Sequence, residues 1–359
     1  MLAQPLDDPA RFRATDSVGM FARIYALPDD LESAWRRGLE LPLNETFLRI
    51  GKVLICGSEE GAFVGELVTQ VIASTCNIPT MVSRSSDLPA FADGQSTLVI
   101  LIDPTGDDLH TLAARDLADA RGTKMIAITP DGALSKAADK AGSTVWTLKQ
   151  PSPPRAAIGE QIGLLLAFIN RLGWGRDLEP EVREAVAVMR AERDLIGLDV
   201  PPTHNPAKRL AWQMIGRIPL IYGAGAMATA ARRWKSQINQ NAKAVAFADA
   251  LPDLLFSTLS GLGVIPDGVR LAAFCLATPS ESEQTKTAQS VARSIFMMEG
   301  IVPDMVSAKG KGLLTQVMYA VQFGDYVSCY LAVASDIDPT LNPAREEVES
   351  QLRSLRFTR

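Results

Sequence analysis

The sequence predicts an α/β protein with two doubly wound parallel sheets, each covered on both faces by helices. Short apolar segments rich in β-branched residues alternate with longer amphipathic segments along most of the chain, as in parallel sheets with helical crossovers. The length of 359 residues exceeds what a single core usually fills. The alternation also stops at a proline-rich stretch near the middle and then starts again. We therefore expect two αβα domains, with further helices at both ends of the chain.

In the first half, a polar helical region is expected over residues 1–48 and the first α/β domain over 49–198. Apolar, β-branched segments predict its strands at 52–57, 78–83, 97–103, 124–129 and 144–148. Amphipathic segments predict its helices at 62–75, 109–122, 132–142, 155–172 and 179–197.

The stretch LDVPPTHNP contains prolines that cannot continue a helix, so residues 199–206 are expected to be a linker. The second α/β domain is expected over 207–359. Its predicted strands are 218–223, 244–249, 269–277 and 301–308. Its predicted helices are 227–243, one starting at Pro252, 282–300, 313–334 and 344–356.

The composition indicates a folded protein of the cytoplasm. Hydrophobic residues make up 47% of the chain and charged residues 21%, which is too apolar for disorder. The net charge of −5 gives no basic surface for nucleic acid or for an anionic membrane. Apolar runs such as 164–169 are far shorter than the ~20 residues that a membrane-spanning helix needs. We expect neither a nucleic-acid partner nor a membrane partner.

The cysteines and histidines do not suggest a metal or a cofactor. The four cysteines lie far apart, without a CxxC pair, and three of them fall in apolar segments. Only two histidines exist, His110 and His204, which disfavours both a multi-histidine metal centre and a Ser-His-Asp triad. We expect buried thiols, no metal and no cofactor, and acid/base chemistry supplied mainly by carboxylates.

Three turns follow predicted strands at places where parallel sheets bind ligands, beyond the carboxyl ends of the strands. They are Gly57–Gly61, Asp103–Asp108 and Gly223–Ala226. Each one alone is most simply a tight turn between strand and helix. Three such turns at equivalent places favour a ligand cleft.

The second half resembles a known family. The segment from NPAK (205–208) to LPDL (251–254) resembles the C-terminal domain of bifunctional phosphoglucose/phosphomannose isomerases. GDYVSCYLA (324–332) followed by DIDP resembles their closing helix and tail, and PRAAIG (154–159) resembles their PRAALG segment. The resemblance implies two sugar isomerase (SIS) domains and, because family members pair, a homodimer.

That family interconverts aldose and ketose forms of a six-carbon sugar phosphate, and a glutamate transfers the proton between adjacent carbons. In the family motif NENAK, the glutamate position corresponds here to Gln240 of NQNAK. The histidine assigned to ring opening corresponds to Phe256 of LPDLLFST. Neither an amide nor a phenyl ring can carry the proton, so the resemblance implies degenerate catalytic residues.

The turns that bind phosphate in the family are altered as well. The family's GMGGS and SYSGNT correspond here to GSEEG (57–61) and DPTGDD (103–108), so hydroxyls give way to Gly61 and Asp103 while Thr105 keeps one. The acids in these turns would repel a dianion. The binding candidates in the two turns are Gly57, Ser58, Gly61, Asp103, Thr105, Asp107 and Asp108.

Three alternatives for the acids remain open. Asp and Glu at helix starts are favoured as caps without any ligand role. They could also form a site for a cation or an amino group, or supply a new carboxylate base, for which Glu59, Asp107 and Asp108 are the candidates.

Basic residues and histidines complete the candidates. Arg155 of PRAAIG and Lys243 of NQNAK match the family and are candidates for holding the ligand. Arg233 and Lys235 also match basic positions, although basic residues on helices are usually solvated. His204 is a candidate for entering the site of a partner subunit, or is simply a linker residue beside a helix start. His110 is either a proton shuttle or, as favoured, a surface residue.

Two functions are therefore weighed. The preferred one is a weak or non-catalytic relative of the isomerases that binds a sugar phosphate or related metabolite and acts as a regulator or scaffold. The alternative is an active isomerase whose acid/base residue has moved to another carboxylate.

Overall fold

The computed structural model describes residues 6–149 and 153–356 and contains two parallel sheets. The first sheet has the strand order β2-β1-β3-β4-β5. Its strands are β1 (Lys52–Cys56), β2 (Thr80–Ser83), β3 (Thr97–Ile102), β4 (Lys124–Thr129) and β5 (Thr144–Thr147). The strand order turns back between β1 and β3, which pair in parallel from Lys52 opposite Thr97 to Cys56 opposite Leu101. All of β3 is buried, as expected for a central strand covered on both faces.

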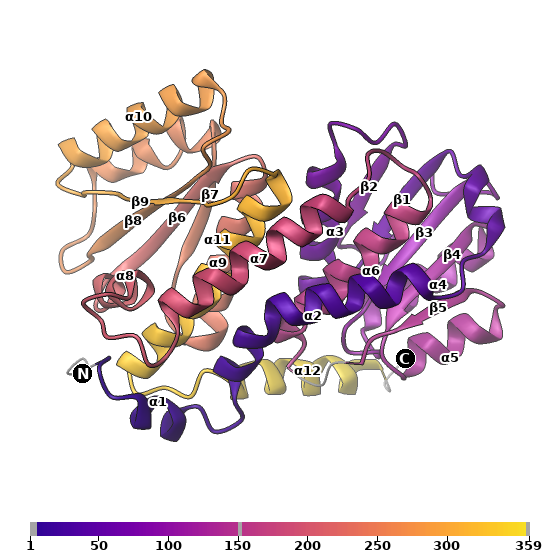
Figure 1. The fold of residues 1–359 in the computed structure, drawn as a ribbon, viewed down its shortest axis with the longest axis horizontal. Helices are drawn as coiled ribbons and strands as arrows, with labels where there is room; N and C mark the ends of the chain where they lie inside the picture. The colour runs from indigo at the N-terminus through magenta and orange to yellow at the C-terminus, as the bar shows by residue number, and fades with distance from the viewer. Residues whose placement is uncertain (1–5, 150–152, 357–359) are drawn as a thin grey trace.

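Helices cover both faces of this sheet. The helical segments of this half of the chain are α1 (Pro9–Thr15), α2 (Met20–Glu40), η1 (Glu45–Arg49), α3 (Glu59–Ile72), α4 (Leu109–Ala120), α5 (Ala133–Lys140), η2 (Pro154–Ala156), α6 (Ile158–Arg171) and α7 (Glu179–Ile196). Figure 1 shows α2 crossing the sheet beside α6. The two helices approach so closely that a Cβ at Gly163 would lie 2.6 Å from the carbonyl oxygen of Leu31, so glycine is needed there.

The second sheet has the order β7-β6-β8-β9, with all neighbours parallel. Its strands are β6 (Ile218–Ala224), β7 (Phe247–Leu251), β8 (Leu271–Ala277) and β9 (Asp304–Ser307). The helices of this half are α8 (Pro206–Met214), α9 (Ala226–Asn241), α10 (Glu283–Met298), α11 (Leu313–Ala334) and α12 (Pro343–Arg356). The predicted class, two parallel-sheet αβα units flanked by helices, is confirmed.

One predicted helix is wrong. Instead of a helix starting at Pro252, the chain forms two short 3₁₀ segments, η3 (Asp253–Leu255) and η4 (Leu259–Gly263). Gly261 and Gly263 fall within this stretch, and glycine disfavours a continuous α-helix because of its conformational entropy.

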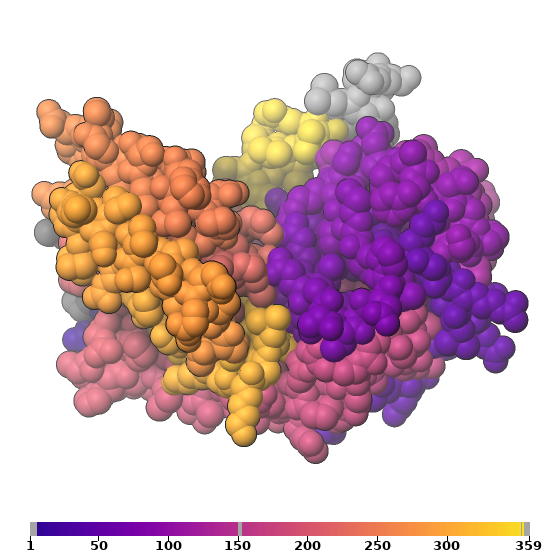
Figure 2. All heavy atoms as spheres, turned by 90° about the horizontal axis from the view of Figure 1, so that it is seen from above, coloured from indigo at the N-terminus to yellow at the C-terminus, as the bar shows by residue number. Residues whose placement is uncertain are grey.

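Helix α11 forms the centre of the molecule. Every residue from Leu314 to Ala334 is buried, and the helix packs against α7, α8 and α9. Figure 1 shows α7 and α11 running between the two sheets, and α12 passing beneath the first one. In Figure 2 the orange lobe of the second sheet and the purple lobe of the first are separated by a furrow.

Three further observations concern the cysteines, groups of potential metal ligands and long apolar helices. Cys56, Cys275 and Cys329 are buried free thiols, and Cys76 is a half-buried one. Within residues 6–149 and 153–356, no group of three potential metal ligands is found. The helices of the same described ranges include none that is long and apolar enough to cross a bilayer.

Candidate functional site

The carboxyl ends of β1 and β3 lie where the strand order of the first sheet turns back, the usual ligand position in such sheets. The turn from β1 into α3 passes very close to β3. A Cβ on Gly61 would lie 2.2 Å from the carbonyl oxygen of Ile102, and one on Gly57 would lie 2.7 Å from the same atom. A serine at position 61 therefore requires the backbone to move.

The turn after β3 is filled by its own carboxylate, that of Asp103, which is only 1% exposed. Its Oδ1 accepts hydrogen bonds from the backbone N–H of Thr105 (2.8 Å) and from the Thr105 hydroxyl (2.6 Å). Its Oδ2 accepts one from the backbone N–H of Asp108 (2.9 Å). Burial raises the pKa of Asp103, and these hydrogen bonds act in the opposite direction.

The two following acids cap helices. The carboxylate of Asp108, at the start of α4, accepts hydrogen bonds from the backbone N–H of Thr111 (2.8 Å) and from its hydroxyl (2.7 Å). The carboxylate of Asp107 accepts one from the backbone N–H of Ala133 (2.9 Å), where α5 begins. These contacts match the capping alternative.

At the start of α3, Glu59 is exposed and Glu60 is buried with 6% of its surface accessible. Glu59 forms an ion pair with Arg345 of α12 (2.5 Å). Burial raises the pKa of the Glu60 carboxyl, Glu59 raises it further, and Arg345 and Arg233 oppose the rise.

Arg345 also contacts Gln240, which lies on the last turn of α9. The Gln240 Oε1 accepts a hydrogen bond from Arg345 Nη1 (3.3 Å), and its Nε2 donates one to the Ser236 hydroxyl (3.0 Å). The arginine additionally pairs with Glu349 on its own helix (2.7 Å). Thus α12 links Glu59 to Gln240, and sequence reasoning missed it because nothing in the spacing of α12 says which helices it meets.

Arg155 and Lys243, the two basic residues that match the family, already form hydrogen bonds within the chain. Arg155 is 3% exposed. It donates hydrogen bonds to Asn241 Oδ1 (2.9 Å) and to the carbonyl oxygens of Pro339 (2.9 Å) and Thr340 (2.7 Å). Lys243 donates to the carbonyl oxygens of Asn241 (3.0 Å) and Asp338 (2.8 Å). Partial burial, followed by the nearby Arg155, lowers the pKa of Lys243 to about 8.

Arg233 is buried rather than solvated, contrary to the expectation for a basic helix residue. Its guanidinium pairs with Asp325 of α11, with Nε–Oδ1 at 3.1 Å and Nη2–Oδ2 at 2.8 Å. It also donates to the carbonyl oxygen of Arg155 (2.9 Å). The local sequence cannot show this, because the partner lies on another helix.

The remaining candidates lie at the surface or at a helix start. Phe256 is 78% exposed just after η3. His204 is exposed before α8, with its Nδ1 3.1 Å from the Thr203 hydroxyl. His110 is exposed in the first turn of α4, as favoured from the sequence. Ser58 precedes α3, and its hydroxyl makes no capping hydrogen bond.

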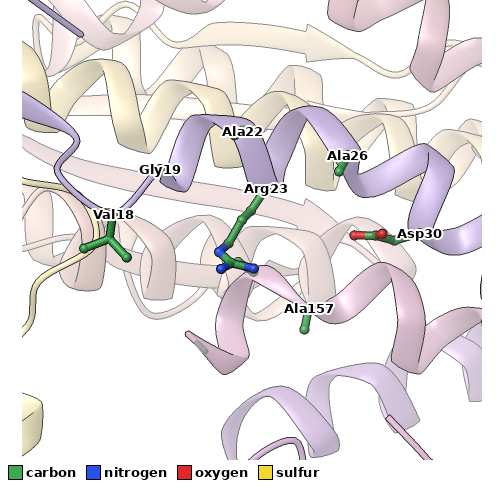
Figure 3. A pocket seen from close by; sticks show the side chains of 8 residues that line it. Val18, Gly19, Ala22, Arg23, Ala26, Asp30 and Ala157 are labelled. Atoms are coloured by element: carbon green, nitrogen blue, oxygen red, sulfur yellow. The ribbon is translucent and has the colours of Figure 1, made fainter. Parts of the chain in front are cut away.

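Two cavities lie outside the predicted site. The first, about 310 Å³, lies between α2 and the start of α6, and the side chains of Arg23 and Asp30 project toward it in Figure 3. Burial, followed by Glu160 and Asp29, raises the pKa of Asp30 to about 6. The second, about 560 Å³, is lined by residues of the N-terminal helices and α7, including Phe12, Tyr25 and Arg193. Sequence reasoning found neither, since their lining residues come from separate elements and form no motif.

Comparison with known proteins places the chain in a family. The family model described as "Bacterial phospho-glucose isomerase C-terminal SIS domain" matches residues 203–350. The chain is 32% identical over 324 residues to a bifunctional phosphoglucose/phosphomannose isomerase of Caldicellulosiruptor bescii, covering 89% of this chain and 95% of that protein. The chain belongs to the bifunctional phosphoglucose/phosphomannose isomerase family. A member from Aquifex aeolicus is 25% identical over 302 residues, covering 84% of this chain and 90% of its own length.

Solved structures share the fold of this isomerase-family chain. A hypothetical protein from Thermus thermophilus has a TM-score of 0.73 at 14% identity, covering 96% of this chain and 93% of its own. A glucose-6-phosphate isomerase like protein from the same organism has a TM-score of 0.63 at 21% identity, covering 94% and 98%. The family therefore places the chain among the phosphosugar isomerases of sugar-phosphate metabolism.

Proposed function

We propose that this chain is a weak or non-catalytic member of its family, which binds a carbohydrate derivative, either a sugar phosphate or a related metabolite, and acts as a regulator or scaffold. The observation that carries the proposal is Gln240. The resemblance puts this residue at the position of the proton-transferring glutamate, and its amide lies between the Ser236 hydroxyl and Arg345. An amide cannot take a carbon-bound proton, and loss of a general base typically costs ~10²–10⁴-fold in rate.

Two further features support weak or absent turnover. Phe256 stands at the position of the ring-opening histidine and has no proton to give. Arg155 and Lys243 hold main-chain carbonyl groups of residues 338–340, so a ligand would have to compete for them. The ligand is proposed to contact the turns at Gly57–Gly61 and Asp103–Asp108, with Arg155 and Lys243 nearby.

The test is a coupled assay for fructose 6-phosphate formed from glucose 6-phosphate and from mannose 6-phosphate. We expect no turnover, or turnover near the limit of detection, by the purified protein. Robust turnover of either sugar phosphate would contradict the proposal.

The second candidate, an active isomerase with a relocated base, is favoured by one observation. Glu60 is a buried carboxyl in the first turn of α3; burial raises its pKa, and the charges of Arg345 and Arg233 oppose this rise. A base works best when its pKa lies near the working pH. Under this candidate, turnover by the wild type is lost in Glu60→Gln and retained in Gln240→Ala.

The proposal also covers assembly and organisation. A homodimer is supported by large exposed apolar side chains in the second half of the chain, among them Phe247, Phe256, Val264, Met298 and Val302. We propose the division into residues 1–48, 49–198, 199–206 and 207–359, and a cytoplasmic location.

A further inference from the structure

The larger of the two cavities, about 560 Å³, lies where α1 and α2 meet the end of α7 and helix α11. Its buried lining is aromatic and comes from three helices. These side chains, each at most 4% exposed, are Phe12 of α1, Phe21 of α2 and Tyr326 of α11. None of the described residues that line the cavity belongs to the turns at Gly57–Gly61 and Asp103–Asp108. An apolar cavity with a few polar groups is the usual form of a small-molecule site.

One of those polar groups is a buried hydroxyl without a partner. Helix α11 carries three buried tyrosines, and two of them are hydrogen-bonded to α7. The hydroxyl of Tyr319 donates to Glu192 Oε1 (3.2 Å), and that of Tyr330 donates to the carbonyl oxygen of Ile196 (2.6 Å). Tyr326 is 1% exposed, makes no hydrogen bond with its side chain in residues 6–149 and 153–356, and is the one of the three that lines the cavity. A buried hydroxyl left unpaired is costly, so a group inside the cavity is expected to pair with it.

The surroundings of this hydroxyl place it at the wall of the cavity. Burial raises the pKa of Tyr326, the charge of Arg193 opposes the rise, and Tyr25 and Asp194 add to it. Arg193, Tyr25 and Asp194 all line the same cavity. A group bound there can therefore contact the Tyr326 hydroxyl and a charged side chain of α7 together.

Five charged residues line the cavity. They are Arg13, Asp16, Arg193, Asp194 and Asp199. Arg193 pairs with an aspartate of α2 (2.6 Å), and Arg13 pairs with Asp199 (3.4 Å). The Asp16 carboxylate accepts hydrogen bonds from backbone N–H groups at the start of α2 (2.8 and 2.9 Å). Within the described part of the chain, Asp194 is the one member of this set without a hydrogen bond or ion pair. The charge left for a ligand is therefore negative.

We infer that this cavity binds a small organic cation, with an apolar or aromatic body and an ammonium group. The body packs against the aromatic lining, which also attracts cations through its ring faces. The ammonium group has three N–H donors and no acceptor, so it can donate both to the Tyr326 hydroxyl and to the Asp194 carboxylate. This site is separate from the one in the proposed function, and neither depends on the other.

The test uses phenethylamine, phenethyl alcohol and phenylpropionate as probes in calorimetry. The three share a ring and a chain and differ in an ammonium, a hydroxyl or a carboxylate group. We expect phenethylamine to bind wild type at least about tenfold more tightly than phenylpropionate, because the unpaired charge at the cavity attracts the cation and repels the anion. Phenethyl alcohol should fall between them. No binding of phenethylamine, or binding of phenylpropionate as tightly, overturns the inference.

Two variants locate the site. Asp194→Asn should weaken phenethylamine about tenfold and leave phenethyl alcohol within about twofold. Tyr326→Phe should weaken phenethylamine about fivefold, the value of one hydrogen bond. Asp267→Asn is the matched control, because Asp267 is an exposed carboxylate outside the cavity lining, and it should change the affinity by less than about twofold. If neither cavity variant weakens phenethylamine, or if the control weakens it as much, the inference is wrong.

The stability of Tyr326→Phe without ligand gives an independent readout. Because the hydroxyl has no partner to lose, urea unfolding should find this variant at least as stable as wild type. A clear loss of stability, or failure to fold, would show that the hydroxyl is already paired and would overturn the inference. Any of these failures leaves the proposed function intact, because the coupled assay with sugar phosphates does not involve this cavity.

Discussion

Replacing Arg233 by methionine should destabilise the protein strongly, because it leaves the Asp325 carboxylate buried without its counterion. Both side chains are almost fully buried, with 4% and 6% exposed, and two hydrogen bonds of 3.1 and 2.8 Å join them. Removing one partner of such a pair typically costs about 3–5 kcal/mol of unfolding free energy. The double variant Arg233→Met/Asp325→Leu should lose less, because it leaves no buried charge.

The pH dependence gives a second readout. Burial already raises the pKa of Asp325, and the pairing with Arg233 opposes that rise, so the pKa of Asp325 in folded Arg233→Met rises further. A carboxyl with a raised folded-state pKa lowers stability fully above that pKa, and this cost shrinks as the pH falls from the folded-state pKa to the unfolded-state pKa. Urea unfolding of the wild type, the single variant and the double variant at neutral and acidic pH measures how this stability cost depends on pH.

The reasoning predicts that the gap in unfolding free energy between Arg233→Met and the double variant narrows as the pH is lowered. A single variant within about 1 kcal/mol of wild type at neutral pH would refute it. A gap that does not change with pH would equally show that the cost is lost packing rather than an unpaired charge.

Three further predictions concern the site and assembly. Gln240→Glu alone should not give an efficient isomerase in the coupled assay, and the double variant with Phe256→His should at best turn over slowly. The reason is that a misplaced substrate alone can lower the rate ~10²-fold. Efficient turnover by the single variant would contradict this prediction. Gly61→Ser should lower the free energy of unfolding in urea by about 1–3 kcal/mol, because its Cβ would meet the Ile102 carbonyl oxygen. The control Gly261→Ser, whose Cβ meets nothing within 4 Å, should change it by less than about 0.5 kcal/mol. Equal losses in the two variants would contradict this prediction. Light scattering at micromolar concentration should give a dimer, shifted toward monomer by Phe256→Glu, and a wild-type monomer would count against the proposed assembly.

Much of the fold could be predicted because each element has its own local pattern. The run TLVILID predicted a strand, and β3 is one, buried along its whole length. The run from Leu313 to Ala334 predicted an apolar helix, and α11 is buried almost throughout. The helix predicted from Pro252 is wrong. The prediction relied on the alternation of strands and helices and took no account of Gly261 and Gly263, which disfavour a continuous helix there.

The candidate site was only partly predictable. The sequence indicated the turns at Gly57–Gly61 and Asp103–Asp108 as the ligand edge, since the position of a turn after a strand is a local property. It did not indicate that the Asp103 carboxylate saturates the donors of its own turn. It named Arg155 and Lys243 as candidates for holding a ligand, but it did not indicate that both are hydrogen-bonded to main-chain carbonyl groups.

Apart from the stretch after Pro252, the sequence by itself determined which segments are strands and helices, because periodicity and residue type act over a few neighbouring residues. It also established that residue 240 is an amide, at the position where the resemblance implies a glutamate. Only the tertiary structure decided which polar and charged side chains meet. Arg345 contacts Gln240, which lies 105 residues away in the sequence, and Arg233 pairs with Asp325, which lies 92 residues away. Such pairings depend on how helices pack against one another, and neither partner's local sequence carries that information.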